Sequence, residues 1–213
     1  MTIQIVFFDG FDMLDALAPY EVFSFASEVT GGRISVKLVT AEDHDLIPSG
    51  ITGLEMRAHG KLDLNEDGVI VLPGAAGSVD ENSPDSLFAR VTKAAQGLLG
   101  KRMIEAFSKD TLTIATVCGG SMLLSFLGLL KGRNATTHHM GLDIIKQNGA
   151  NVIPARVVDD GKLISAGAVT SGLDLAIYLV EKLCGTDAAL AVEQMFEYER
   201  RGVVWKATDH LSV

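Results

Sequence analysis

Residues 111–130 constrain the fold more than any other stretch, because they place a buried strand and a buried helix directly after one another. The first part reads TLTIATV, a short run of β-branched and apolar residues typical of a strand covered on both faces. The part after Gly120 reads SMLLSFLGLL and is apolar nearly all round, as expected of a helix in the middle of a domain. Both elements need further layers of structure to cover them.

Cys118 lies at the junction between this strand and this helix, followed by Gly119 and Gly120. A strand that turns at once into a helix directs such a side chain out of the carboxyl edge of the sheet, above the free amides of the helix start. Those amides carry positive partial charge, so we expect them to favour a thiolate and to lower the pKa of Cys118. The alternative is a small buried residue that fills the strand end. The two glycines allow a tight turn and a close approach of a ligand, which favours the reactive thiol.

The length of 213 residues suits one α/β domain, which we expect to span residues 1–213. The net charge of −9 and the lack of basic clusters argue against nucleic acid or an anionic membrane as a partner. No apolar run reaches the ~18 residues of a transmembrane helix, and the first residues lack the basic start of a signal peptide. Two distant cysteines form neither a disulfide framework nor a zinc pattern. We therefore expect a cytoplasmic protein with no metal and no cofactor.

Short apolar runs alternate with helical patterns along the chain, which predicts a three-layer α/β/α domain around a mainly parallel sheet. Ligands bind outside the carboxyl ends of the strands in such sheets. Three loops are expected to meet there, at residues 9–18, 73–77 and 118–120. The strands are expected at residues 3–8, 34–39, 67–72 and 111–117, with a hairpin of residues 152–158 and 162–166.

Prolines and glycines predict where two of the helices begin or end. Pro19 is expected to be the first residue of the helix after the first loop, because the amide that proline lacks would have no partner at that position. Ser83 is likewise expected to cap a helix that has Pro84 in its first turn. That second helix should end at Gly100.

Several motifs, in this order along the chain, resemble the ThiJ/PfpI superfamily, whose fold is similar to flavodoxin and to the class I glutamine amidotransferase domain. They are FDGFDMLDALAPYEVF, VIVLPGAAG, IATVCGGSMLL, KGRNATTHH and ISAGAVTSGLDLAIYLVE. The combination of LDALAPYEVF, ATTH and AGAVTSGLDLA looks most like the isonitrile hydratase branch. The resemblance implies a cysteine-dependent enzyme that acts on a small molecule and forms a homodimer.

The resemblance also implies a partner for the cysteine. In that family an acidic residue of the first loop faces the cysteine, and its place in LDALAPYEVF corresponds to Asp15. A carboxyl beside a thiolate cannot easily stay charged, so the two groups should share one proton. The expected state is a neutral Asp15 that donates a hydrogen bond to an anionic Cys118. The alternative for Asp15 is an ordinary turn or cap residue, and Asp9 and Asp12 lie in the same loop.

Backbone amides and one histidine complete the expected site. Family members usually have two successive glycines after the strand that precedes the cysteine strand, whereas this chain has Gly74 and Ala75. The amides of Ala75 and Gly119 are candidates for stabilising an anion, and an ordinary loop is the alternative. His138 stands where a histidine recurs in the superfamily. It is interpreted either as a base at the mouth of the site or as a capping or interface residue.

Two absences narrow the chemistry that the resemblance implies. Gly119 follows the cysteine where protease-like and glyoxalase-like members carry histidine, and the late His–x–Glu of the amidotransferases is missing after Ala166. The expected reaction is therefore hydration of a small organic isonitrile to an N-substituted formamide, with Cys118 as nucleophile and Asp15 as acid and base. The hydratase branch usually has threonine at the position of Gly119, which implies slower turnover or a different substrate. The alternatives are a non-catalytic redox or small-molecule sensor and a weak glyoxalase or deglycase.

Overall fold

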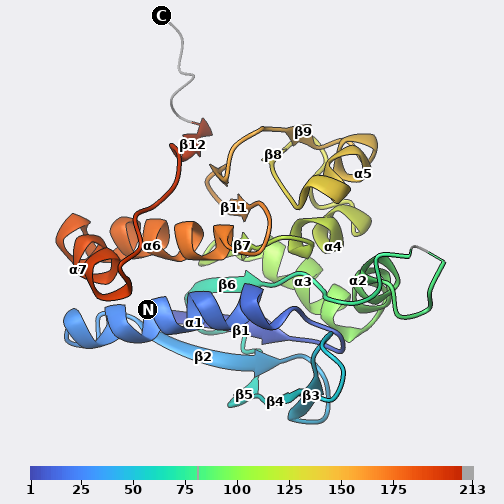
Figure 1. Ribbon diagram of the computed structural model, residues 1–213, viewed down its shortest axis with the longest axis horizontal. Coiled ribbons are helices and arrows are strands. Elements are labelled where there is room, and N and C mark those ends of the chain that lie inside the picture. Colours follow the sequence, from blue (N-terminus) through green and yellow to red (C-terminus); the bar gives the residue numbers. More distant parts are fainter. Residues whose placement is uncertain (81, 208–213) are drawn as a thin grey trace, which may run out of the picture.

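A central sheet of eight strands organises the part of the chain that this computed structural model describes, residues 1–80 and 82–207 (Figure 1). Residues 81 and 208–213 of the expected 1–213 domain lie outside the described part. In spatial order the strands are β12 (Trp205–Lys206), β10 (Val157–Asp159), β11 (Leu163–Ala166), β7 (Leu112–Thr116), β6 (Gly68–Leu72), β1 (Thr2–Phe7), β2 (Ser35–Thr40) and β5 (Gly60–Lys61). Neighbouring strands run parallel except β10 and β11, so the mainly parallel sheet is confirmed.

Helices cover both faces of this sheet, as the alternation of strand and helix patterns predicted. Helices α1, α6 and α7 pack against one another, and α2, α3 and α4 form a second packed group. Two small ribbons, β3–β4 and β8–β9, lie outside the main sheet. Their bounds, with those of the helices, are α1 (Met13–Val29), β3 (Leu46–Pro48), β4 (Glu55–Arg57), α2 (Leu87–Gln96), α3 (Leu98–Ser108), α4 (Gly120–Phe126), β8 (Asn134–Ala135), the 3₁₀ helix η1 (His139–Gly141), α5 (Leu142–Gln147), β9 (Asn151–Val152), α6 (Ser171–Cys184) and α7 (Thr186–Phe196).

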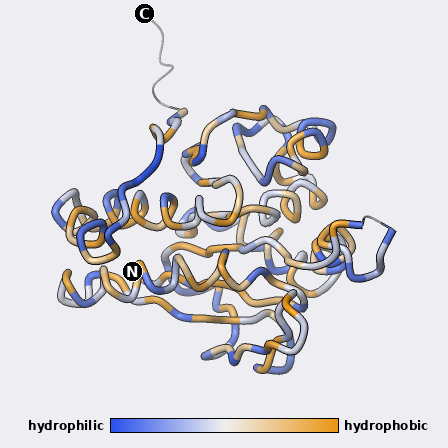
Figure 2. Tube along the Cα trace, in the orientation of Figure 1, coloured by the Kyte–Doolittle hydropathy of each residue, from blue (hydrophilic) through white to orange (hydrophobic). Residues whose placement is uncertain are grey.

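The central strands β1, β6 and β7 carry the core. Five of the six residues of β1 and all five of β6 are buried, which their β-branched and apolar composition explains. Figure 2 shows the same contrast along the chain: the middle of the sheet is hydrophobic, whereas the outlying loop before α2 and the segment leading to β12 are hydrophilic. The interior is therefore built around the strands that end at the expected site.

The register of these strands brings the expected loops together. Leu72, the last residue of β6, pairs with Thr116, the last residue of β7, and Ile5 of β1 pairs with Val71 of β6. Because the strands are parallel, the segments that follow them leave the sheet at the same edge. The predicted meeting of the three loops is confirmed.

The expected start of the first helix at Pro19 is wrong. Helix α1 begins at Met13, and Pro19 lies inside it. The side chain of Asp12 caps the helix by accepting hydrogen bonds from the amides of Leu14 and Asp15. This cap satisfies two of the free amides of the first turn and starts the helix well before the proline. Asp15 therefore belongs to the first turn of a helix and not to a loop.

The second helix also differs from the expectation. Its cap is Ser86, whose hydroxyl accepts from the amide of Ala89, so Ser83 and Pro84 lie in the preceding loop. The helix ends at Gln96, and Gly97 in an extended conformation separates it from α3, so the expected end at Gly100 is wrong. Of Gly97 and Gly100, it is therefore Gly97 that interrupts the helical pattern.

The expected strand at residues 152–158 is divided in two. Asn151 and Val152 form β9, and Val157–Asp159 form β10, which pairs with β11 in the predicted antiparallel manner. Pro154 lies between them. Because proline has no amide to donate, it interrupts a ladder of hydrogen bonds at this point.

Candidate active site

Cys118 takes an unusual backbone conformation between β7 and α4, with a φ of +51° in the left-handed region. A residue other than glycine stays there only when the surrounding structure holds it. The amide of Cys118 donates to the carbonyl oxygen of Gly167 over 2.9 Å, and the hydroxyl of Thr137 donates to the carbonyl oxygen of Cys118 over 2.6 Å. These two hydrogen bonds fix the peptide units on both sides of the residue, and so fix where its side chain begins.

Two glycines allow the ends of β6 and β7 to approach each other closely. A Cβ atom on Gly120 would lie 2.2 Å from the carbonyl oxygen of Leu72, and one on Gly74 would lie 2.6 Å from the amide nitrogen of Gly119. Both obstacles are backbone atoms, so neither position accepts a side chain. A Cβ atom on Gly119 would instead meet its nearest neighbours at 3.5 Å, an ordinary van der Waals distance. The backbone packing therefore requires glycine at 74 and 120 but not at 119.

Asp15 is the acid of the candidate site, and its side chain is completely buried. Its Oδ2 atom accepts a hydrogen bond from the amide of Gly74 over 2.9 Å, whereas Oδ1 has no hydrogen-bond partner of good geometry among the described residues. Burial first, and then the charge of Asp12, raise the pKa of Asp15 to about 8, although the Gly74 amide and the Cys118 thiol act against this rise. Asp15 is thus a neutral carboxylic acid at pH 7, which agrees with the prediction from the sequence.

The thiol of Cys118 differs from the prediction. Burial first, and then the nearby Asp15, raise the pKa of Cys118 well above its usual range, although the amides of Val169 and Gly119 donate to the sulfur and act against this rise. The residue is 8 % exposed, so the cost of charging the sulfur outweighs the effect of the amides. The expected lowering of this pKa is therefore wrong. Asp15 and Cys118 form an uncharged pair at neutral pH, in which each group keeps its proton.

The expected amide pair is only partly available. The amide of Gly119 is near the sulfur of Cys118 and opposes the rise of its pKa, so it acts on the nucleophile itself. Ala75 is buried and borders the cavity beside the thiol, and it is not among the described residues with a positive φ, so its methyl group causes no backbone strain. The amide of Asp12 donates to the carbonyl oxygen of Gly74 over 2.9 Å, which ties this loop to the start of α1.

A cavity of about 210 Å³ opens above the thiol. Its walls come from the start of α1, the loop after β6, helix α2, helix α4 and the segments around residues 138 and 169. They are mostly apolar, which suits a small ligand with a hydrocarbon body. The lining residues are Asp12, Ala75, Ala76, Gly77, Leu87, Val91, Cys118, Gly119, Met122, His138, Met140 and Val169.

His138 borders this cavity and also caps η1, because its Nδ1 atom accepts from the amide of Met140 over 3.3 Å. With Nδ1 accepting, the ring proton of the neutral form lies on Nε2. Burial first, and then the neighbouring His139, lower the pKa of His138, so its ring is neutral at pH 7. The interpretation as a cap is therefore confirmed. His138 also lies at the cavity, and its role as a base stays a prediction.

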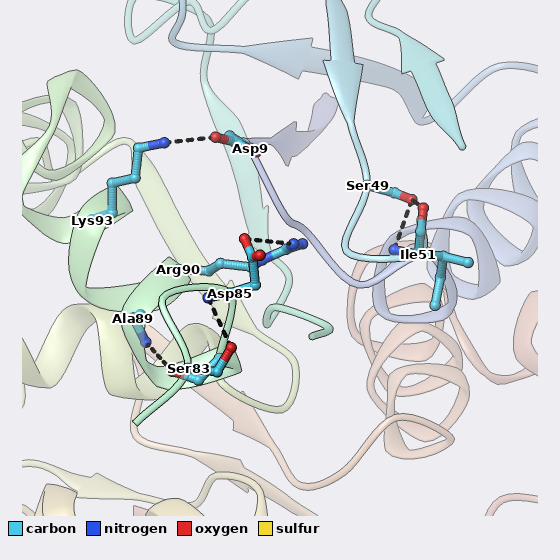
Figure 3. Close-up of polar contacts among 9 residues, drawn as sticks. Asp9, Ser49, Ile51, Ser83, Asp85, Ala89, Arg90 and Lys93 are labelled. Carbon is cyan, nitrogen blue, oxygen red and sulfur yellow. Dashed lines mark hydrogen bonds and ion pairs between the residues drawn. The ribbon is translucent and has the colours of Figure 1, made fainter. Parts of the chain in front are cut away.

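Ion pairs hold the loops at one side of the cavity to α2. The Lys93 ammonium contacts Oδ2 of Asp9 at 2.7 Å, and the guanidinium of Arg90 contacts Asp85 at 3.5 Å (Figure 3). Asp9 is exposed and paired in this way, so it is a surface group of the first loop. Of the three aspartates in this segment, Asp15 faces the thiol, Asp12 caps the helix, and Asp9 binds a lysine.

Sequence reasoning missed the contributions of Thr137 and Val169. Both residues lie inside motifs that carried the resemblance, ATTHH and AGAVTSG, but neither was assigned a role. Thr137 and Val169 lie 19 and 51 positions after Cys118, and the sequence gives no local signal for contacts over such separations.

The cavity beside the thiol is not the largest hollow of the described residues. Two larger hollows, of about 560 and 740 Å³, are lined by no cysteine.

The described residues contain neither a cluster of metal-binding side chains nor a membrane-spanning helix. Within residues 1–80 and 82–207, no group of three or more histidine, cysteine, aspartate or glutamate side chains is arranged to hold a metal ion. Over the same residues, no helix is long and apolar enough to cross a membrane.

Comparison with known proteins gives consistent matches. The chain is 32% identical to an isonitrile hydratase of Pseudomonas putida over 206 residues, which cover 93% of this chain and 79% of that protein. It is 28% identical to a deglycase of Thermococcus kodakarensis over 174 residues, 78% of this chain and 89% of the relative. A crystal structure of a ThiJ/PfpI family protein from Pseudomonas syringae superposes with a TM-score of 0.75 at 25% identity, covering 94% of this chain and 76% of that one.

The pattern of the DJ-1/PfpI family matches residues 1–182, which is most of the chain. The isonitrile hydratase at 32% identity likewise covers most of the chain. The chain belongs to the DJ-1/PfpI family.

Proposed function

We propose that the protein hydrates small organic isonitriles to N-substituted formamides. The observation that carries this proposal is the buried carboxyl group of Asp15 next to the buried thiol of Cys118, beneath a small and mostly apolar cavity. Burial raises the pKa of both groups and so favours their protonated forms. An isonitrile is neutral, has an apolar substituent and accepts both a nucleophile and a proton at its terminal carbon. The relative that is an isonitrile hydratase supports the same choice.

The first step joins the sulfur to the substrate. The sulfur of Cys118 forms a bond to the terminal isonitrile carbon, Asp15 transfers its proton to that carbon, and the thiol proton passes to Asp15. The product is a thioimidate, S–CH=N–R, and Asp15 is protonated again. Because Oδ2 accepts from the Gly74 amide, the proton of the neutral acid is assigned to Oδ1, the oxygen without another partner. No net charge develops in the pair, so the raised pKa of each group is compatible with the chemistry.

The second step releases the product. Water adds across the C=N bond with its oxygen on carbon: the protonated Asp15 first gives its proton to the nitrogen, and its carboxylate then takes the proton that the water releases. The C–S bond then breaks, the sulfur regains a proton through Asp15, and the formamide leaves. Each step moves one proton in and one proton out of the same carboxyl group, which is the role that a buried neutral acid with a pKa near the working pH can fill.

The experiment that tests the proposal is incubation with cyclohexyl isonitrile, with N-cyclohexylformamide measured by gas chromatography. The wild-type protein should form the product, and Cys118→Ala should reduce the rate to that of the solution without protein. Cys184→Ala is the matched control, because Cys184 lies half-buried on α6 and does not border the cavity. Product formation no faster than with Cys118→Ala would contradict the proposal.

A deglycase is the second candidate, because one relative at 28% identity carries that name. Consumption of methylglyoxal by the wild type and not by Cys118→Ala, without turnover of an isonitrile, would favour it. The redox sensor is less well supported. Oxidation by peroxide proceeds through the thiolate, and burial works against the thiolate of Cys118.

Two further predictions accompany the proposed enzyme. The protein should form a homodimer, which light scattering coupled to size-exclusion chromatography would test. It should also be found in the cytoplasm, which cell fractionation would test.

A further inference from the structure

The cavity above the thiol has an uneven distribution of charge. Among the described residues that line it, Asp12 is the one with a side chain that is charged at neutral pH. His138 also borders the cavity, but burial and the neighbouring His139 lower its pKa and keep the ring neutral. The other lining residues are alanine, glycine, leucine, valine, methionine and the thiol of Cys118. A ligand that enters the cavity therefore meets one negative charge on otherwise uncharged and mostly apolar walls.

The carboxylate of Asp12 is held in one position. Its Oδ1 atom accepts from the amide of Leu14 over 2.9 Å and from the amide of Asp15 over 3.3 Å. Its own amide donates to the carbonyl oxygen of Gly74. Among the residues that the structure describes, no lysine, arginine or histidine forms an ion pair with Asp12, whereas the nearby Asp9 is paired with Lys93. Asp12 thus presents a fixed charge that no basic side chain neutralises.

The charge of Asp12 acts on the reacting groups. It contributes to the raised pKa of Asp15 and, to a smaller extent, to that of Cys118. A negative charge that opposes the ionisation of these groups also opposes any other anion brought to the same place. The apolar walls strengthen this effect, because a cavity of low polarity screens charge less than water does.

We infer that Asp12 determines which substrates reach Cys118, by excluding compounds that carry a carboxylate and by favouring neutral compounds and those that carry an amine. This inference rests on the proposed function for the identity of the substrate, an isonitrile, but the selection by charge concerns any reagent that reaches the thiol. The overall charge of −9 acts in the same direction from a distance, and salt screens it. The contribution of Asp12 should persist at 0.5 M salt because the residue lies at the cavity itself.

The first test compares kcat/KM at pH 6 for a neutral, an anionic and a cationic isonitrile, namely butyl isonitrile, isocyanoacetate and 3-(dimethylamino)propyl isonitrile. The wild type should prefer the cation to the anion by a factor of ten or more, mainly through KM. Asp12→Asn should reduce this ratio about tenfold, because asparagine removes the charge and remains a good helix cap. Asp15 of the wild type is protonated at pH 6, because its pKa is about 8.

Asp9→Asn is the matched control for the test. Asp9 lies three residues before Asp12 on the same segment, but it is exposed, paired with Lys93 and absent from the lining of the cavity. This variant removes the same charge from the protein and should leave the preference unchanged. An equal change with Asp9→Asn, or no change with Asp12→Asn, would overturn the inference.

A second measurement separates this inference from the proposed function. Iodoacetamide and iodoacetate are similar in size, and the sulfur displaces iodide from either, but only iodoacetate is an anion. Their rates of reaction with Cys118 can be followed by mass spectrometry in a Cys184→Ala background, even if no isonitrile is hydrated. Asp12→Asn should raise the rate with iodoacetate relative to iodoacetamide about tenfold at 0.5 M salt. An unchanged ratio would overturn the inference, whatever the outcome of the hydratase assay.

Discussion

Asp15 and Asp159 are two buried carboxyl groups, but their surroundings give them opposite properties. Asp15 is fully buried and accepts one hydrogen bond, from the amide of Gly74. Asp159 is 7% exposed and accepts hydrogen bonds from the hydroxyl of Tyr178 and the ammonium of Lys182, both at 2.6 Å, and from the amide of Gly161 at 2.8 Å. One carboxyl group is left nearly without partners and the other has three.

The pKa values follow from this difference. Burial raises the pKa of both groups. For Asp15 burial prevails and the pKa reaches about 8, whereas for Asp159 the hydrogen bonds from Lys182 and Tyr178 outweigh burial and the pKa falls below its usual value. Asp159 is a buried carboxylate that is paired with Lys182 and so joins β10 to α6. A buried carboxyl group without a cation is an acid that can give up and take back a proton.

The largest effect expected from this contrast concerns catalysis. Asp15→Asn should lower the rate of isonitrile hydration by roughly 10²–10⁴-fold, because asparagine cannot exchange a proton with the substrate. Asp159→Asn should retain the wild-type rate, since Asp159 interacts with Tyr178 and Lys182 of α6 and not, as Asp15 does, with Cys118. Formation of N-cyclohexylformamide measures both. Equal losses in the two variants would show that the contrast has no bearing on function.

The next effect concerns stability. Between pH 5 and 8 the unfolded chain carries an ionised Asp15, whereas the folded protein keeps it protonated, so the unfolded state binds fewer protons and wild-type stability falls as pH rises. Asp15→Asn removes this dependence. The free energy of unfolding of the variant, relative to wild type, should therefore rise by up to about 1.4 kcal/mol per pH unit over that range.

Urea unfolding at pH 5 and pH 8 measures this difference. The comparison concerns the change with pH and not the value at one pH, so a constant effect of the substitution on packing does not disturb it. A difference that is the same at both values would mean that Asp15 is ionised in the folded protein.

The dependence of the rate on pH should show the same acid. The proposed mechanism needs Asp15 protonated, so the rate with a neutral isonitrile should fall above about pH 8 and be about tenfold lower one unit higher. Asp159→Asn should give the same profile as the wild type. A rate that increases through pH 9 would point instead to a thiolate nucleophile formed without the help of Asp15.

The smallest effect is expected from Asp159 on stability. Asp159→Asn should lower the free energy of unfolding at pH 7 by about 1 kcal/mol, a modest value because Lys182 is 41% exposed and water screens the pair. Since the pKa of Asp159 is lowered in the folded protein, its contribution is present above pH ~4 and is lost as pH falls below that. Thermal unfolding of the variant and wild type should therefore converge in acid, and a gap that stays constant would contradict this account.

The sequence was sufficient to predict the central strands and the mainly parallel sheet, because each central strand is a short apolar run and the patterns alternate with helices. It was less reliable for helix starts. Pro19 and Pro84 each suit the first turn of a helix, but side-chain caps at Asp12 and Ser86 set the actual starts. A proline and a capping residue can both mark a helix start, and only packing decides which of them prevails.

For the candidate site, the meeting of the three loops followed from the parallel sheet, and the pairing of Asp15 with Cys118 came from the resemblance. The ionisation of the thiol could not be predicted. It depends on the depth of burial, on the nearby Asp15 and on the amide of Val169, which approaches from a distant part of the chain. A helix start favours a thiolate in general, but here the loss of water around the sulfur is the stronger effect.

Gly119 gives the protein a position that laboratory evolution can exploit. Its neighbours Gly74 and Gly120 are closed to any side chain, whereas a Cβ atom at residue 119 would make only ordinary contacts at 3.5 Å. Alanine at this position would therefore place its methyl group against Gly74 and Val91, on the wall of the cavity, without moving the backbone. The wall of the cavity can thus be varied at the residue directly after Cys118, between two glycines that accept no side chain.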